Sequence, residues 1–62
     1  MNKDEVVQMM VDGFIEDMKS IYSSAGISDE ESDQYIEQGL RSFSLICNNT
    51  YDRLLEKSLI NS

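Results

Sequence analysis

Cys47 carries the most nucleophilic side-chain type in this chain, and it is the single cysteine among 62 residues. A thiol becomes a catalytic nucleophile when a nearby base or cation stabilises its thiolate, and the sequence has no histidine for that role. Acid–base chemistry would then depend on carboxylates, lysine or tyrosine placed in a cleft, which two short helices rarely enclose. We therefore expect no catalytic residue, a buried Cys47, and a protein that is not an enzyme.

The acidic run 29–33 is the segment that most resembles a metal site. It lacks the alternating ligands and the glycine of a calcium loop, and the absence of histidine with a single thiol excludes the usual zinc and di-iron ligand sets. A helix start explains the run better, because carboxylates there stabilise the positive end of the helix dipole. We expect no metal ion and no cofactor.

Twelve acidic and five basic residues give a formal net charge of −7, which disfavours direct binding to nucleic acid. The acidity has two interpretations: it keeps a small protein in solution, or it forms a face that docks on a basic protein surface. Glu16 and Lys19, three residues apart, would balance part of that face. The candidate docking residues are Asp12, Glu16, Asp17, Asp33 and Glu37. Spaced carboxylates on a rigid helix can also mimic a nucleic-acid backbone, as in antagonists of the kind that phages and mobile elements encode.

Three basic residues, Arg41, Arg53 and Lys57, share the second half of the chain. In size and expected hairpin the chain resembles the small RNA-binding four-helix-bundle dimers that regulate plasmid copy number. That resemblance is architectural, without a shared motif, and implies an RNA-binding helical dimer as a further alternative.

Two apolar stripes determine the elements that would position all of these residues. Each stripe alternates steps of four and three residues, which keeps its side chains on one face of an α-helix. The first stripe is Val7, Val11, Phe14, Met18, Ile21 and Ala25, and the second is Ile36, Leu40, Phe43, Cys47, Thr50 and Leu54. The sequence predicts an all-α, single-domain antiparallel hairpin over residues 1–62.

The helix boundaries follow from capping residues. We expect the first helix at about 4–24 with Asp4 as its N-cap, a turn at 25–28 around Gly26, and a second helix at about 29–58 that begins after a capping box of Ser28 and Glu31. A break near Asn48-Asn49 would instead give a third short helix, but one continuous helix is preferred.

The second helix is expected to be longer than the first by about ten residues, at 1.5 Å per residue. Its apolar residues past position 50 would then lack a partner in the hairpin, and Leu45 points away from the stripe. These residues form a predicted protein interface of Leu45, Tyr51, Leu54, Leu55, Leu59 and Ile60. A dimer that forms a four-helix bundle would cover them.

The composition also indicates the cellular compartment of the protein. A lone thiol suits a reducing compartment, residues 1–5 lack the apolar core of a signal peptide, and no apolar run is long enough to cross a membrane. We expect a cytoplasmic protein, of a bacterium or of an infected host cell. The sequence as a whole indicates a small acidic regulator or inhibitor that binds itself and another protein.

Overall fold

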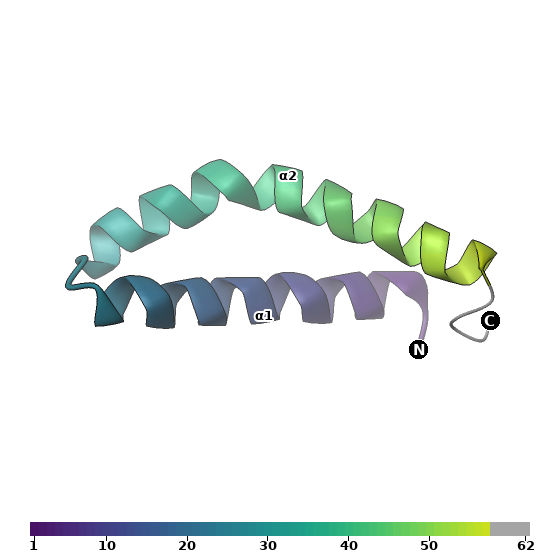
Figure 1. Ribbon diagram of the computed structural model, residues 1–62, viewed down its shortest axis with the longest axis horizontal. Coiled ribbons are helices and arrows are strands. Elements are labelled where there is room, and N and C mark those ends of the chain that lie inside the picture. The colour runs from purple at the N-terminus through teal and green to yellow at the C-terminus, as the bar shows by residue number, and fades with distance from the viewer. Residues whose placement is uncertain (58–62) are drawn as a thin grey trace.

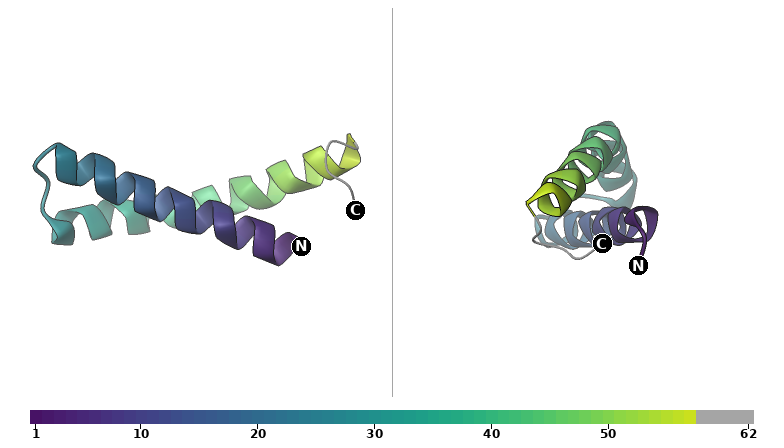
Figure 2. Two further views of the ribbon diagram at one scale, coloured as in Figure 1. Left: turned by 90° about the horizontal axis from the view of Figure 1, so that it is seen from below. Right: turned by 90° about the vertical axis from the view of Figure 1, so that its right-hand side faces the viewer.

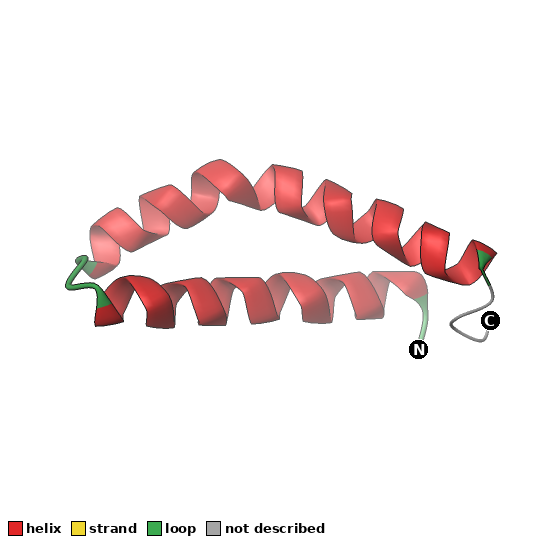
Figure 3. Ribbon diagram, viewed as in Figure 1, coloured by secondary structure: helices red, strands yellow, loops and turns green. Residues whose placement is uncertain are grey.

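The computed structural model describes residues 1–57. Within them the chain forms two helices, α1 (Lys3–Ser24) and α2 (Asp29–Glu56), and no strand. The helices run antiparallel and pack against each other along their length (Figures 1 and 3). The predicted all-α hairpin is therefore confirmed.

Helix α1 begins one residue earlier than the sequence indicated. Asn2 is the N-cap, and its side-chain Oδ1 accepts a hydrogen bond from the backbone N–H of Glu5 at 2.9 Å. The prediction of Asp4 as N-cap is wrong, because Asn2 satisfies the free backbone donors first and leaves Asp4 inside the first turn. There the carboxylates of Asp4 and Glu5 lie at the positive end of the helix dipole.

The turn between the helices is a Schellman motif followed by an N-cap. Gly26 has a φ of 81°, and its N–H donates to the carbonyl of Ser23 at 3.0 Å. The N–H of Ile27 donates to the carbonyl of Tyr22, also at 3.0 Å. Ser28 then opens α2, with its hydroxyl accepting from the N–H of Glu31 at 3.3 Å. The predicted positions of Gly26 and Ser28 are confirmed.

Helix α2 is continuous through Asn48 and Asn49. The side-chain amide of Asn48 donates to the carbonyl of Ser44, four residues earlier, at 2.9 Å, so the asparagine lies within the helical ladder rather than ending it. Figure 1 shows that α2 arches, with its convex side away from α1. Such curvature is usual in a helix with one face in water.

The two helices cross at an angle rather than lying parallel, as the views in Figure 2 show. The molecule is a rod of 42 × 17 × 16 Å with a radius of gyration of 13.9 Å. A compact domain of this length has a radius of gyration of about 10.5 Å. The hairpin therefore has a large surface for its mass.

The open end of the hairpin is fixed by an ion pair between Lys3 and Asp52. This register leaves residues 53–56 of α2 beyond the first residue of α1, a shorter extension than the ten residues expected from helix lengths. Part of the difference comes from the earlier start of α1 and the end of α2 at Glu56. Of the described helices, neither combines the length and the apolar character that crossing a membrane requires.

Candidate interaction surfaces

The core of the hairpin is thin. Val7, Ile36 and Cys47 are the buried apolar residues of the described chain, and Ser32, four residues before Ile36, is buried near the turn. None of the described side chains is shielded from solvent completely. Two helices alone enclose one narrow seam, so the remaining apolar residues stay partly exposed.

Two aromatic pairs bridge the helices across this seam. The rings of Phe14 and Phe43 stack with centroids 4.1 Å apart and planes 15° from parallel. Nearer the turn, Tyr22 and Tyr35 make a tilted contact at 5.6 Å. Tyr22 is half-buried, whereas Ile21 is largely exposed, so the first stripe does not continue inward through Ile21 as predicted. The crossing of the helices explains this shift, because it turns a different flank of α1 toward α2 at each end.

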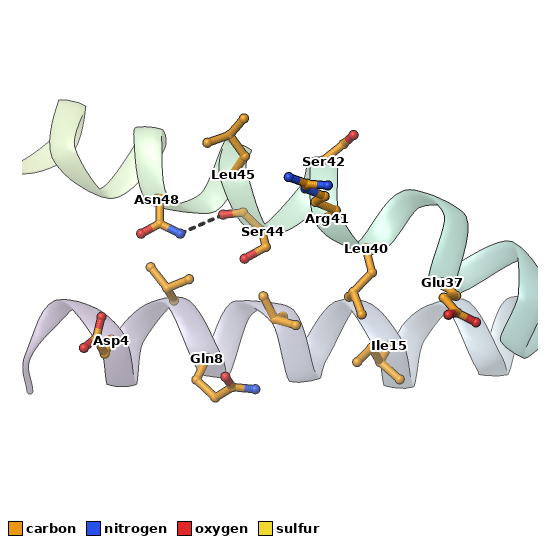
Figure 4. A pocket seen from close by; sticks show the side chains of 12 residues that line it. Asp4, Gln8, Ile15, Glu37, Leu40, Arg41, Ser42, Ser44, Leu45 and Asn48 are labelled. Carbon is orange, nitrogen blue, oxygen red and sulfur yellow. Dashed lines mark hydrogen bonds between the residues drawn. The ribbon is translucent and has the colours of Figure 1, made fainter.

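A groove lies between the helices on one side of the hairpin, with a volume of about 1060 Å³ (Figure 4). Its apolar lining consists of Val7, Val11, Ile15, Leu40 and Leu45. Its polar lining consists of Asp4, Gln8, Glu37, Arg41, Ser42, Ser44 and Asn48. Leu40 points from α2 toward α1, whereas Leu45 points away from α1 along the α2 rim of the groove (Figure 4). The sequence did not reveal the groove, which depends on the crossing and arch of the helices.

The charges on the groove are of both signs. Asp4 and Glu37 bring carboxylates to it, and Arg41 brings a guanidinium. Within residues 1–57 the ion pairs are Lys3 with Asp52 at 3.0 Å and Lys19 with Asp33 at 3.6 Å. Arg41 therefore has no carboxylate partner in the described chain, and its side chain is exposed.

The predicted interface residues that the structure describes differ in their exposure to solvent. Leu45 is 62% exposed and Leu55 is 37% exposed, whereas Tyr51 and Leu54 are half-buried. Leu59 and Ile60 lie outside the described residues. Ile46, which the sequence reasoning did not select, is 58% exposed. It follows Leu45 directly, and successive helical residues are 100° apart, so the two side chains serve different faces of α2.

The predicted acidic residues are all exposed and come from both helices: Asp12, Glu16, Asp17, Asp33 and Glu37. Two of them have polar partners, since Asp33 pairs with Lys19 and Asp12 accepts a hydrogen bond from the side-chain amide of Gln8 at 2.9 Å. Lys19 thus pairs across the helices rather than with Glu16 on its own helix. The two helices lie close together near the turn, which brings Asp33 of α2 within reach of the Lys19 side chain of α1.

The basic residues of α2 are spread around the helix. Arg41 lines the groove, whereas Arg53 lies twelve residues further on, which is 120° around the helix axis, and Lys57 caps the end of α2. This separation does not bring the three positive charges together on one strip of a monomer.

The groups with potential chemistry are scattered. Cys47 is buried within the seam, the position expected for it from the second stripe. In the described part of the chain, no three metal-ligating side chains come close enough to hold an ion. The groove between α1 and α2 is a concave feature of the described residues with both apolar and polar side chains in its lining.

Comparison with known proteins gives no further assignment. The sequence matches no protein-family model and no curated protein, and the hairpin matches no solved structure. The function must accordingly be inferred from the surfaces of the hairpin itself.

Proposed function

We propose that this chain is a small acidic protein-interaction module that self-associates and acts as a regulator or inhibitor by binding a protein partner. The proposal assigns it no catalytic step and no cofactor. A cytoplasmic setting, with the thiol of Cys47 kept reduced, fits this role.

The observation that supports the proposal is that the hairpin buries few apolar residues and leaves others largely exposed. Within residues 1–57 the buried apolar residues are Val7, Ile36 and Cys47, while Leu45 and Ile46 are more than half exposed. Burial of apolar area is the main term that offsets the conformational entropy lost on folding. A chain of this size can bury only a small apolar area by itself. Association would bury more of this area, as in a bundle of four helices.

The experiment is a measurement of mass and stability over a range of protein concentrations. Light scattering after gel filtration should give a mass near twice the 7.1 kDa of the chain. The melting temperature should rise with concentration, because association stabilises only the folded state. A helical protein that stays at the mass of one chain, with a melting temperature independent of concentration, would contradict self-association.

A second candidate is mimicry of a nucleic-acid backbone. Glu16, Asp17 and Glu37 are exposed, and in the described chain none of them forms an ion pair. Binding of a nucleic-acid-binding protein would then weaken in high salt and on the double change Glu16→Gln and Asp17→Asn. For the single change Glu16→Gln, the single change Asp52→Asn neutralises a paired carboxylate outside the predicted acidic residues and provides a control with the same charge change. Partner binding that is insensitive to both salt and Glu16→Gln would count against mimicry.

A further inference from the structure

We propose that the groove between α1 and α2 is where a second copy of this chain docks, with Leu45 and Arg41 as contact residues. This inference rests on the self-association proposed above and deepens it by naming the surface. Leu45 lies on the α2 rim of the groove, and Arg41 lines it from the same helix.

The open shape of the groove favours a macromolecular occupant over a small molecule. Its volume of about 1060 Å³ is at the upper limit of the roughly 300–1,000 Å³ found for small-molecule pockets. Such pockets surround most of their ligand, whereas this groove is open along its side and has an apolar floor between two exposed rims. A packed helix fills a space of this shape, because its side chains enter the seam while its backbone stays outside.

The surface area of the chain leaves about the area that pairing with a second copy would cover. The accessible surface is 4907 Å² for a mass of 7.1 kDa. A compact monomer of that mass exposes about 4,100 Å². The excess is roughly 800 Å², which is the area that each partner buries in a protein–protein interface of standard size. One two-fold interface would therefore bring each chain to the surface area of an ordinary folded protein.

The charges of the groove also suit a second copy. A two-fold interface brings the same surface of each copy together, so a surface of one sign would repel itself. The groove instead has carboxylates at Asp4 and Glu37 and a guanidinium at Arg41 that lacks an ion-pair partner within residues 1–57. In a protein of net charge −7, this set has two negative groups and one positive group, so two copies repel each other less on this side than two wholly acidic surfaces would.

Two neighbouring residues of α2 give a matched test. Leu45→Asp places a carboxylate on the rim of the groove, and Ile46→Asp places the same carboxylate one residue further on, outside it. Both side chains are about equally exposed, so both changes should leave the helical content of the hairpin nearly intact. Sedimentation equilibrium should show that Leu45→Asp raises the dimer dissociation constant about tenfold or more, and that Ile46→Asp changes it far less.

The two arginines of α2 give a second matched pair. Arg41→Glu and Arg53→Glu make the same charge change on the same helix, and Arg41 alone of the two lines the groove. General repulsion between acidic chains is therefore equal in both variants. The Arg41→Glu dimer should be the weaker of the two, and the difference should shrink in high salt as the charges are screened.

The outcomes separate the groove from self-association itself. If Ile46→Asp dissociates the dimer as much as Leu45→Asp does, the copies meet on another face; the groove proposal is then overturned while self-association stands. Equal effects of the two arginine variants would likewise overturn a role for Arg41. A folded wild-type monomer at high concentration overturns both proposals and leaves the groove for a different protein.

Discussion

Lys3 of α1 and Asp52 of α2 join the two helices at the open end of the hairpin, although they are 49 positions apart in the chain. The lysine Nζ lies 3.0 Å from one carboxylate oxygen and 3.2 Å from the other. The pair aligns the first residue of α1 with a residue about one turn before the end of α2. Both side chains are solvent-exposed, so the pair specifies alignment more than it adds stability.

We expect the Lys3–Asp52 pair to have a small, salt-sensitive coupling energy. Lys3→Ala, Asp52→Ala and the double variant form a thermodynamic cycle, which should give about 0.2–1 kcal/mol in low salt and nearly nothing in molar salt. The free energy of unfolding of each variant, measured by urea denaturation, provides the cycle. A coupling that persists in molar salt would show that the pair is better shielded from water than the structure indicates.

The stacked rings of Phe14 and Phe43 should contribute most to the stability of the seam. Replacing either half-buried ring with alanine should cost about 2–3 kcal/mol, and the double-variant cycle should add a coupling of about 0.5–1.5 kcal/mol for the stacking. Met9→Ala, on the exposed face of α1, should change stability by less than about 0.5 kcal/mol. Urea denaturation followed by circular dichroism measures all four variants.

Gly26 and Gly39 should respond in opposite directions to the same substitution. A Cβ at either position would meet no atom within 4 Å, so the backbone decides the result. Gly26→Ala places an L-residue at a φ of 81° and should destabilise the protein by about 1–2 kcal/mol.

Gly39→Ala, in the interior of α2, should stabilise the protein by about 0.5–1 kcal/mol. Thermal melts of both variants at one protein concentration test this pair. Destabilisation by Gly39→Ala would indicate that another chain approaches the helix closely at that point.

The thiol of Cys47 should react slowly with a bulky aromatic disulfide reagent. Its burial requires the seam to open first, so the rate should fall about tenfold for each 1.4 kcal/mol of opening free energy. A double variant with Cys47→Ser and Ile46→Cys moves the thiol to an exposed position on the same helix and should react without that delay. Equal rates in the two proteins would contradict a stably packed seam.

Local sequence signals identified most of the elements, and their failures have local causes. Gly26 and Ser28 mark the turn because each has a property that few residue types share. Gly26 adopts a left-handed backbone conformation, and Ser28 provides a capping hydroxyl. At the other end of α1, Asn2 and Asp4 are both good caps, and the first apolar residues of the stripe fit either start. The continuity of α2 through Asn48 was expected, although low helix propensity left a break as the alternative.

The candidate site was harder to predict, because it depends on how two helices meet. Stripe spacing places Ile21 and Tyr22 near the same edge of α1, and only the crossing decides that Tyr22 packs against Tyr35 while Ile21 stays exposed. The groove likewise arises from that crossing and from the arch of α2. Sequence periodicity identified Leu45 as an outward residue, but it did not show that Arg41 and Leu45 border a concave surface.

The single turn at Gly26 also gives folding a direction. The contact between Tyr22 and Tyr35 closes a short loop of the chain, whereas the contact between Lys3 and Asp52 closes a loop of nearly the whole chain. The entropy cost of closing a loop grows with its length. We therefore expect contacts between the helices to form first beside the turn and last at the open end. Changes beside the turn should therefore slow folding, and changes at Lys3 or Asp52 should mainly speed unfolding.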